Sequence, residues 1–140
     1  MSDVDVTRNP AGRAVGYLPD HLKITWETVR SGYARAGFAV ERLHMAPNGY
    51  LHAGGVVTLA DTASGFACLV SLPEGATSFT TIELKSNFLG TAREGERVVC
   101  EARLLHGGRT TQVWDAEVRN ATADKAIALF RCTQMILYPR

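Results

Sequence analysis

One segment constrains the fold of this chain more than any other: HAGGVVTLADTASGFACLV, at residues 52–70. It predicts a helix of about twenty residues that begins at His52 and is stopped by Pro73. Because the segment is apolar on nearly all sides, such a helix needs cover on more than one side. Its one ionised side chain, Asp61, has no oppositely charged residue three or four positions away in either direction.

Segments on both sides of this helix carry strand signals. Upstream, a short helical turn at 19–22 leads into a hairpin whose strands, the second reaching residue 43, flank a turn at 30–32. Downstream, four strand-like stretches alternate with turns, at 77–89, 95–106, 110–120 and 125–138. The order β-β-α-β-β-β-β predicts an α+β fold in which a strongly curved antiparallel sheet of about six strands wraps one long central helix. We expect residues 1–16 to be loosely ordered and residues 17–140 to form a single domain.

Composition excludes several classes of function. The net charge of +1 over 140 residues gives no support to nucleic-acid binding. The N-terminus lacks the apolar core of a secretory signal, and an acid within residues 53–73 argues against a membrane span, so we expect a soluble cytoplasmic protein. Three widely spaced cysteines are typical of structural thiols in a reducing compartment. We expect no metal site, because His44 and His52 lack further ligands at suitable spacing.

The position of Asp61 suggests a function. Burying an unpaired carboxylate costs several kcal/mol, so the cost must be recovered in function or offset by a partner elsewhere in the fold. The small residues that open the helix leave its first backbone N–H groups open to a bound oxygen. Asp61 lies ~13 Å further along the helix axis than His52, so an extended group could contact a helix start in one subunit and an acid in another. A single curved sheet also leaves two open edges, which favours self-association.

Three motifs in this order resemble one known family. They are GYLHAGGVVTLAD, TTIELKSNFLGTAREGE and HGGRTT, and the resemblance spans about residues 20–138. It is to the PaaI-like group of hotdog-fold acyl-CoA thioesterases. Members show a G-x-x-H-G-G opening, an acid nine residues after the His, a later L-x-x-x-F segment and a G-R turn. The corresponding positions here are Gly49, His52, Asp61, Leu84, Phe88, Gly108 and Arg109.

The resemblance implies roles for individual residues. Asp61 would activate water as a general base or attack the thioester carbonyl to form a mixed anhydride. The Ala53 N–H would bind the oxyanion, and His52 would orient or polarise that region. Thr81 matches a position near the attacking water, commonly supplied by the other subunit. Substrate contacts would come from Asn48, Gly54, Gly55, Ser64 and Arg109.

The family also implies an assembly and a substrate. Its members are dimers with active sites at the interface, often paired into homotetramers, and they need no cofactor beyond the coenzyme A of the substrate. The phosphates of coenzyme A call for basic side chains. The candidates on or beside the later strands are Lys85, Arg93, Arg109 and Arg131.

The chain departs from the family pattern at two positions. Ala53 replaces the first glycine after the histidine, which narrows the site but keeps the backbone N–H. Ala46 stands where many relatives carry Asn or Gln to hold the carbonyl or the water, and Asn48 can take that role only if the loop bends differently.

Alternatives stay open at this stage. The first function is hydrolysis of aryl-acetyl or medium-chain acyl-CoA. The second is a hotdog hydratase or dehydratase, against which the nine-residue spacing argues, and the third is a non-catalytic acyl-CoA-binding protein. At the level of residues, Asp61 could be satisfied by buried hydroxyls, His52 could bond a backbone carbonyl, Thr81 could be a plain strand residue, and Asn48 could belong to an ordinary tight turn.

Overall fold

The computed structural model describes residues 10–140. Its elements are α2 (Pro10–Ala14), α3 (Leu18–His21), β1 (Thr25–Arg30), β2 (Tyr33–Ala39), the 3-10 helix η1 (Arg42–His44), α4 (Ala53–Leu69), β3 (Ser78–Phe88), β4 (Arg97–Gly107), β5 (Thr111–Asn120) and β6 (Lys125–Leu137). This confirms the predicted order of strands and of the central helix.

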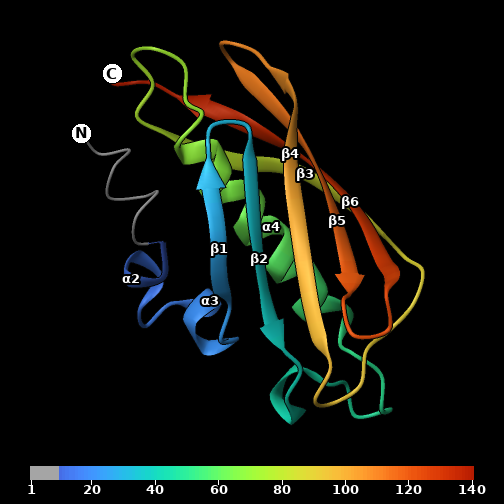
Figure 1. The fold of residues 1–140 in the computed structure, drawn as a ribbon. Helices are drawn as coiled ribbons and strands as arrows, with labels where there is room; N and C mark the ends of the chain where they lie inside the picture. The colour runs from blue at the N-terminus through green and yellow to red at the C-terminus, as the bar shows by residue number, and fades with distance from the viewer. Residues whose placement is uncertain (1–9) are drawn as a thin grey trace.

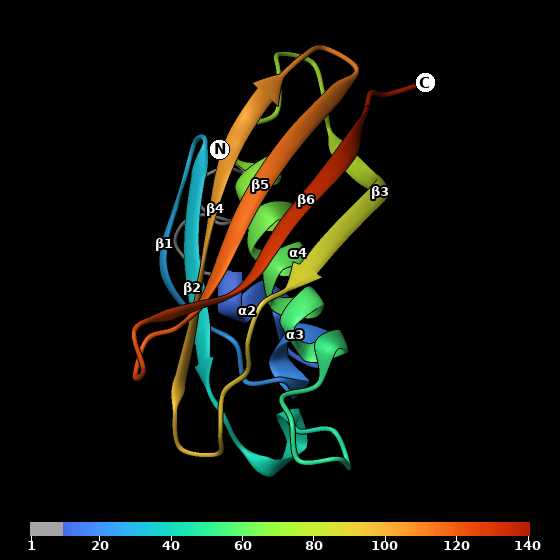
Figure 2. The ribbon, with the colours of Figure 1, turned by 90° about the vertical axis from the view of Figure 1, so that its right-hand side faces the viewer.

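The six strands form one antiparallel sheet in the order β1-β2-β4-β5-β6-β3. The sheet curves around α4, which lies against its concave face (Figures 1 and 2). Strands β1 and β3 are the two edges. The predicted α+β architecture, one long helix wrapped by a curved sheet, is therefore confirmed.

Period-two alternation decides which side chains enter the core. On β2, Ala34, Ala36 and Phe38 are fully buried, and on β5 the same is true of Trp114 and Val118. These side chains pack against the buried face of α4, which contributes Leu59, Ala60, Ala63 and Ala67. Small residues on α4 let the sheet approach the helix closely. Side chains at the contact between the helix and the sheet are therefore well buried.

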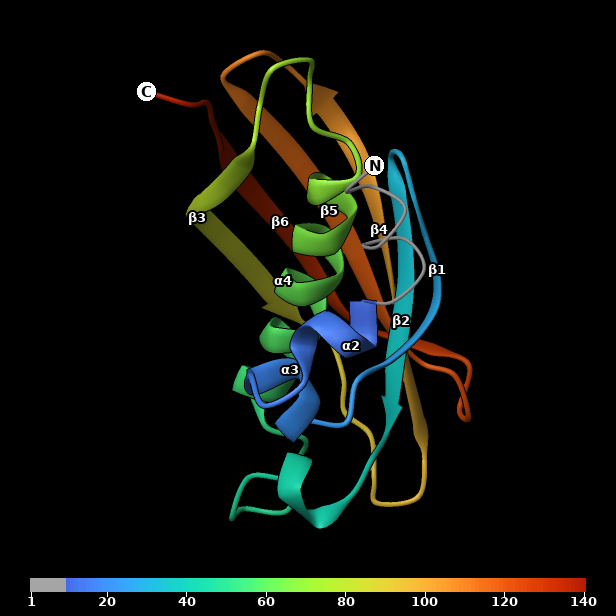
Figure 3. The same cartoon turned by 90° about the vertical axis from the view of Figure 1, so that its left-hand side faces the viewer.

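Helix α4 has defined ends. His52 is its N-cap in an extended conformation, and Val70 is its C-cap, so the helix spans 17 residues and ends before Pro73. Figure 3 shows α3 beside α4 on the side turned away from the sheet. Within residues 10–140, none of the helices is long and apolar enough to cross a membrane.

The structure differs from the sequence-based expectation at two places. Pro10–Ala14 forms a short helix where an irregular segment was expected, and burial of Pro10 and Ala14 holds it in place; residues 1–9 lie outside the described part. Strand β2 ends at Ala39 rather than at residue 43, because Glu41 and His44 form a capping box around η1.

His44 is a structural residue. Its ring stacks on Phe38 at 4.1 Å between centroids, its Nδ1 accepts from the Glu41 N–H at 2.9 Å, and its Nε2 lies 2.7 Å from the Leu22 carbonyl oxygen. Because Nδ1 accepts, Nε2 carries the proton and donates to Leu22. With both ring nitrogens engaged, His44 fixes the chain that leads into α4.

Candidate active site

The first part of the candidate site is the start of α4. The Nδ1 atom of His52 accepts from the Gly54 N–H at 2.8 Å, and the His52 carbonyl oxygen accepts from the N–H groups of Gly55 and Val56. Within residues 10–140, no acceptor takes up the Ala53 N–H. The helix start therefore presents one N–H group, the one predicted as an oxyanion donor, at the positive end of the helix.

The N–H groups of the two glycines after Ala53 are engaged within the helix start, and the predicted contact of these glycines with substrate stays a prediction. The backbone N–H groups of Gly54 and Gly55 are both taken within the helix start, so they are not open to a substrate oxygen. A Cβ atom at position 54 would lie 3.0 Å from His52 Nδ1. Gly54 therefore lets the His52 ring approach and cap the helix.

A hollow of about 450 Å³ opens beside the helix start. It is lined mainly by apolar side chains from the loop before α4, from α4 itself and from the end of β3: Tyr50, Leu51, Ala53, Val56, Phe88, Gly90 and Thr91. Tyr50 and Phe88 are both well exposed in the single chain. An apolar group bound here would lie next to the free Ala53 N–H.

The second part of the site is Asp61, in the third turn of α4. Its carboxyl is half-buried, and its Oδ1 atom is buried without a hydrogen-bond partner among the described residues. Burial raises the pKa of this carboxyl above its ordinary value, and the Thr81 hydroxyl, which lies close enough to donate to the carboxylate, offsets part of the rise. A raised pKa of this origin is typical of an acid that exchanges protons in catalysis.

Buried polar groups surround the carboxyl. Thr81 on β3 donates to Gln134 Oε1 on β6 at 2.7 Å, and the two residues are cross-strand partners. Cys132 faces Asp61 from β6, and burial is the main reason that its thiol has a pKa of about 12. Ser64, one turn after Asp61 on α4, is fully buried beside this thiol.

The structure thus brings Asp61, Ser64 and Thr81 of one chain together. A Thr81 supplied by the other subunit, as the family resemblance implies, stays a prediction. The structure also places Gln134 and Cys132 in this cluster, which the motif analysis missed. A signal was present, because Phe130, Cys132, Gln134 and Ile136 alternate along β6 and all four are buried. A glutamine in the inward register of an apolar strand marks a buried polar contact.

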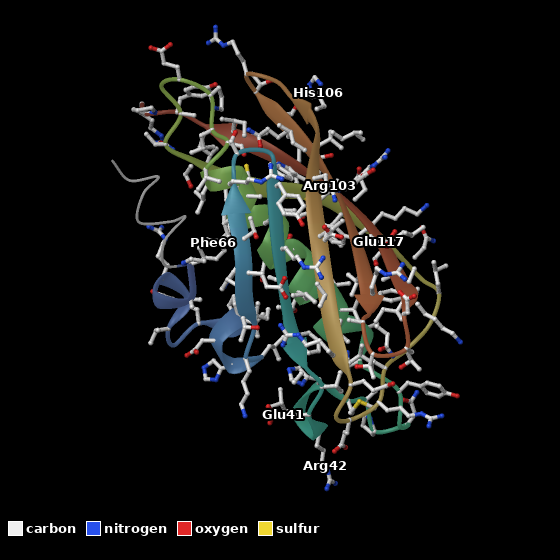
Figure 4. All side chains as sticks on the ribbon, viewed as in Figure 1. Glu41, Arg42, Phe66, Arg103, His106 and Glu117 are labelled. Carbon is white, nitrogen blue, oxygen red and sulfur yellow. The ribbon has the colours of Figure 1, made fainter. Side chains whose placement is uncertain are left out.

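Asn48 and Arg109 lie apart from this cluster. Asn48 is exposed, and its Oδ1 atom accepts from the Tyr50 N–H at 3.2 Å, so its side chain closes its own turn. Arg109 is exposed in the connection between β4 and β5, and its carbonyl oxygen accepts from the Tyr138 hydroxyl. Figure 4 shows His106, near that connection, and Arg42, near the loop before α4, at opposite ends of the molecule. Within one chain, Arg109 therefore lies far from the start of α4.

Other basic candidates occupy different surfaces. Arg131 makes a two-pronged ion pair with Asp115, at 2.5 and 2.8 Å, on the face of the sheet turned away from α4. With Lys85 it lines a hollow of about 620 Å³ whose walls also carry the Arg103 and Glu117 side chains labelled in Figure 4. None of the predicted catalytic residues lines this hollow. Arg93 instead lines a hollow of about 670 Å³ next to the Ala46 turn.

Comparison with known proteins shows to which protein family this chain belongs. The model of the thioesterase superfamily matches residues 48–127, which include the helix start, Asp61 and Thr81. The chain belongs to the thioesterase superfamily. As a member, this thioesterase is a thioester hydrolase, and the predicted resemblance to hotdog-fold thioesterases is confirmed.

Individual relatives agree with this membership. The thioesterase is 33% identical over 117 residues to the 1,4-dihydroxy-2-naphthoyl-CoA hydrolase of Listeria monocytogenes, covering 83% of this chain and 92% of that protein. The structure of the thioesterase PA1618 of Pseudomonas aeruginosa, in a variant, superposes with a TM-score of 0.85 at 27% identity, covering 94% of this chain and 93% of the other. The PaaI protein of the phenylacetic acid degradation operon of Escherichia coli shares the fold, with a TM-score of 0.81 at 24% identity over 93% of this chain and 91% of its own.

Proposed function

We propose that this thioesterase hydrolyses acyl-CoA thioesters with an aryl, aryl-acetyl or medium-chain acyl group, giving the free acid and coenzyme A. Two features of α4 carry the proposal: Asp61 is a half-buried carboxyl with no oppositely charged partner among residues 10–140, and the Ala53 N–H at the start of the same helix has no acceptor among those residues. The Listeria relative is named for an aromatic acyl-CoA substrate. The apolar hollow beside Ala53, with Tyr50 and Phe88 in its wall, suits a group of that kind.

The reaction divides between these two groups. The Ala53 N–H donates to the carbonyl oxygen as negative charge develops on it. Asp61, as carboxylate, either takes a proton from the water that attacks the carbonyl carbon or attacks that carbon itself and forms a mixed anhydride that water then cleaves. In both routes the carbon–sulfur bond breaks, and coenzyme A leaves as a thiolate that takes up a proton.

The two groups act on one carbonyl only if two chains supply them. Ala53 and Asp61 are eight residues apart on α4, which is about 12 Å along the axis. Strand β3 is an edge of the sheet that pairs on one side with β6, and it exposes the apolar side chains of Ile82, Leu84 and Phe88. Antiparallel pairing of two β3 strands would cover these side chains and set the helices antiparallel, with the start of one facing the middle of the other.

We therefore infer a homodimer with active sites at its interface, and pairing of dimers into a tetramer stays a prediction. The same arrangement would bring the Arg109 end of one chain towards the helix start of the other, where a phosphate of coenzyme A needs a cation. That Asn48 takes the place of the polar side chain that Ala46 lacks also stays a prediction. The cytoplasmic location is a prediction too.

The deciding experiment measures coenzyme A release from a panel of aromatic, short-, medium- and long-chain acyl-CoA esters with a thiol reagent. Asp61→Asn should lower kcat by about 10²–10⁴-fold with the oligomer size unchanged, because the amide can neither accept the proton nor attack. Asp115→Asn is the matched control, since it makes the same chemical change on the outer face of the sheet. Absence of release from every ester by the wild type would overturn the proposal, and equal activity of Asp61→Asn would overturn the role of the carboxyl.

A further inference from the structure

Two fully buried glutamines lie side by side on the inner face of the sheet. Gln112 on β5 and Gln134 on β6 are cross-strand partners, and they are 1% and 0% exposed. A buried primary amide must satisfy both a carbonyl oxygen and an NH₂ group, so each glutamine is held by the groups around it. Those groups differ in kind between the two positions.

Gln112 has only one possible orientation. Its Oε1 atom accepts from the Trp114 indole N–H at 2.9 Å, and its Nε2 atom donates to the Ser71 carbonyl oxygen at 2.8 Å. An indole N–H can only donate and a backbone carbonyl can only accept. Reversing the Gln112 amide would therefore break both hydrogen bonds.

Gln134 is held by groups that work in either direction. Its Oε1 atom accepts from the Thr81 hydroxyl at 2.7 Å, and its Nε2 atom lies 3.5 Å from the Cys132 sulfur. A hydroxyl and a thiol can each donate or accept. If the amide reverses, Nε2 donates to Thr81 and the thiol donates to Oε1, so both contacts survive with exchanged roles.

The direction of these bonds matters for Asp61, because the Thr81 hydroxyl carries a single proton. In the observed orientation that proton goes to Gln134, and Asp61 Oδ1 has no hydrogen-bond partner among the described residues. Thr81 can then only accept from the acid, which suits a protonated carboxyl. In the reverse orientation the Thr81 proton is free to be donated to the carboxylate.

We propose that Gln134 is a positioning residue whose amide reverses with the protonation state of Asp61 and thereby sets the direction of the Thr81 hydroxyl. With Asp61 protonated, the bonds run from Thr81 to Gln134 Oε1. With Asp61 ionised, they run from Cys132 through Gln134 and Thr81 to the carboxylate. The proposal rests on the proposed catalytic role of Asp61, and it adds a residue that touches neither the substrate nor the reacting atoms.

In the part of the chain that the structure describes, the other titratable groups near the carboxyl are thiols. Cys132 on β6 faces Asp61, and Cys68 on α4 faces Cys132. Burial gives each thiol a pKa of about 12, so both stay neutral near pH 7 and keep the proton that the reverse orientation requires. Asp115 also raises the pKa of Cys132, and it lies on the outer face of the sheet.

The test is Gln134→Met, which keeps the length of the side chain and removes the amide. Because Thr81 then loses the acceptor that competes with Asp61, the acidic limb of the kcat/KM profile should move about 0.5–1 unit to lower pH. Gln112→Met is the matched control and should leave the limb in place. Gln134→Leu provides a second variant with the same expectation if Gln134→Met does not fold.

A second background shows whether the effect runs through Thr81. Thr81→Val alone should move the limb to higher pH, and adding Gln134→Met to Thr81→Val should cause no further shift. A Gln134→Met profile that superposes on the wild type, or a shift that persists in the Thr81→Val background, would overturn the proposal.

An NMR titration of the ¹³C-labelled Asp61 carboxyl, assigned with Asp61→Asn, measures the same shift without any substrate. If no ester is hydrolysed, the proposed function fails while this titration still decides the role of Gln134.

Discussion

Gln112 and Gln134 are two copies of one side chain at adjacent positions of one sheet, and they differ in what surrounds them. The partners of Gln112 fix the directions of its hydrogen bonds, whereas the partners of Gln134 allow both directions. The fixed amide ties β5 to the chain that follows α4 and so belongs to the framework of the fold. The reversible amide lies beside the half-buried acid. The comparison teaches that burial alone does not tell a structural polar group from a functional one, but the donor and acceptor character of its partners does.

The largest expected effect on stability is at the fixed amide. Gln112→Met leaves the Trp114 N–H and the Ser71 carbonyl without their partner, at a cost of about 2–3 kcal/mol in the free energy of unfolding. Gln134→Met should cost less than about 1 kcal/mol, because Thr81 can turn its proton to Asp61. Urea unfolding of both variants measures the difference. Equal losses would mean that the two amides are held alike, which would break the comparison.

A smaller effect is expected when only one partner of Gln112 is removed. Trp114→Phe keeps most of the buried ring and deletes the indole N–H, so Gln112 Oε1 loses its hydrogen bond. We expect a loss of about 1–2 kcal/mol, which combines the unsatisfied oxygen with a small cavity. In a double-mutant cycle, Trp114→Phe and Gln112→Met should be strongly non-additive, since both break one hydrogen bond. Additive losses would show that the bond contributes little.

Much of the fold could be predicted from the sequence because its strands alternate cleanly. The register that buries Ala34, Ala36 and Phe38 can be read directly, and so can the turns between the later strands. The short helix at Pro10–Ala14 could not, since five residues carry no period and tertiary contacts hold them. The end of β2 was also missed, because the capping box at η1 uses His44, a residue that looks like part of a loop.

Residues of the candidate site can be picked out from the sequence where they break the pattern of their own element. Asp61 stands out as an acid in an apolar helix, and the free N–H at Ala53 follows from small residues at a helix start. Gln134 breaks its pattern just as clearly, but its role depends on Thr81, which lies 53 residues away in the chain. Which groups face a buried amide, and whether they donate or accept, is decided by strand pairing and is visible only in the folded sheet.

The smallest expected effect is a pH dependence of the free energy of unfolding. It arises from Asp61, which lies in the cluster of Gln134, and not from the surroundings of Gln112. Burial raises the pKa of the folded Asp61 carboxyl above its unfolded value, so between the two values the folded state binds more protons than the unfolded state. Stability from this group is therefore fully present below about pH 4 and is lost as the pH rises through the folded pKa, with a slope of at most about 1.4 kcal/mol per pH unit. Asp61→Asn should remove this slope. Gln112→Met should lower the free energy of unfolding at every pH and leave the slope unchanged. Unfolding free energies measured between pH 4 and 8 test both statements, and a slope that survives in Asp61→Asn would assign it to another group.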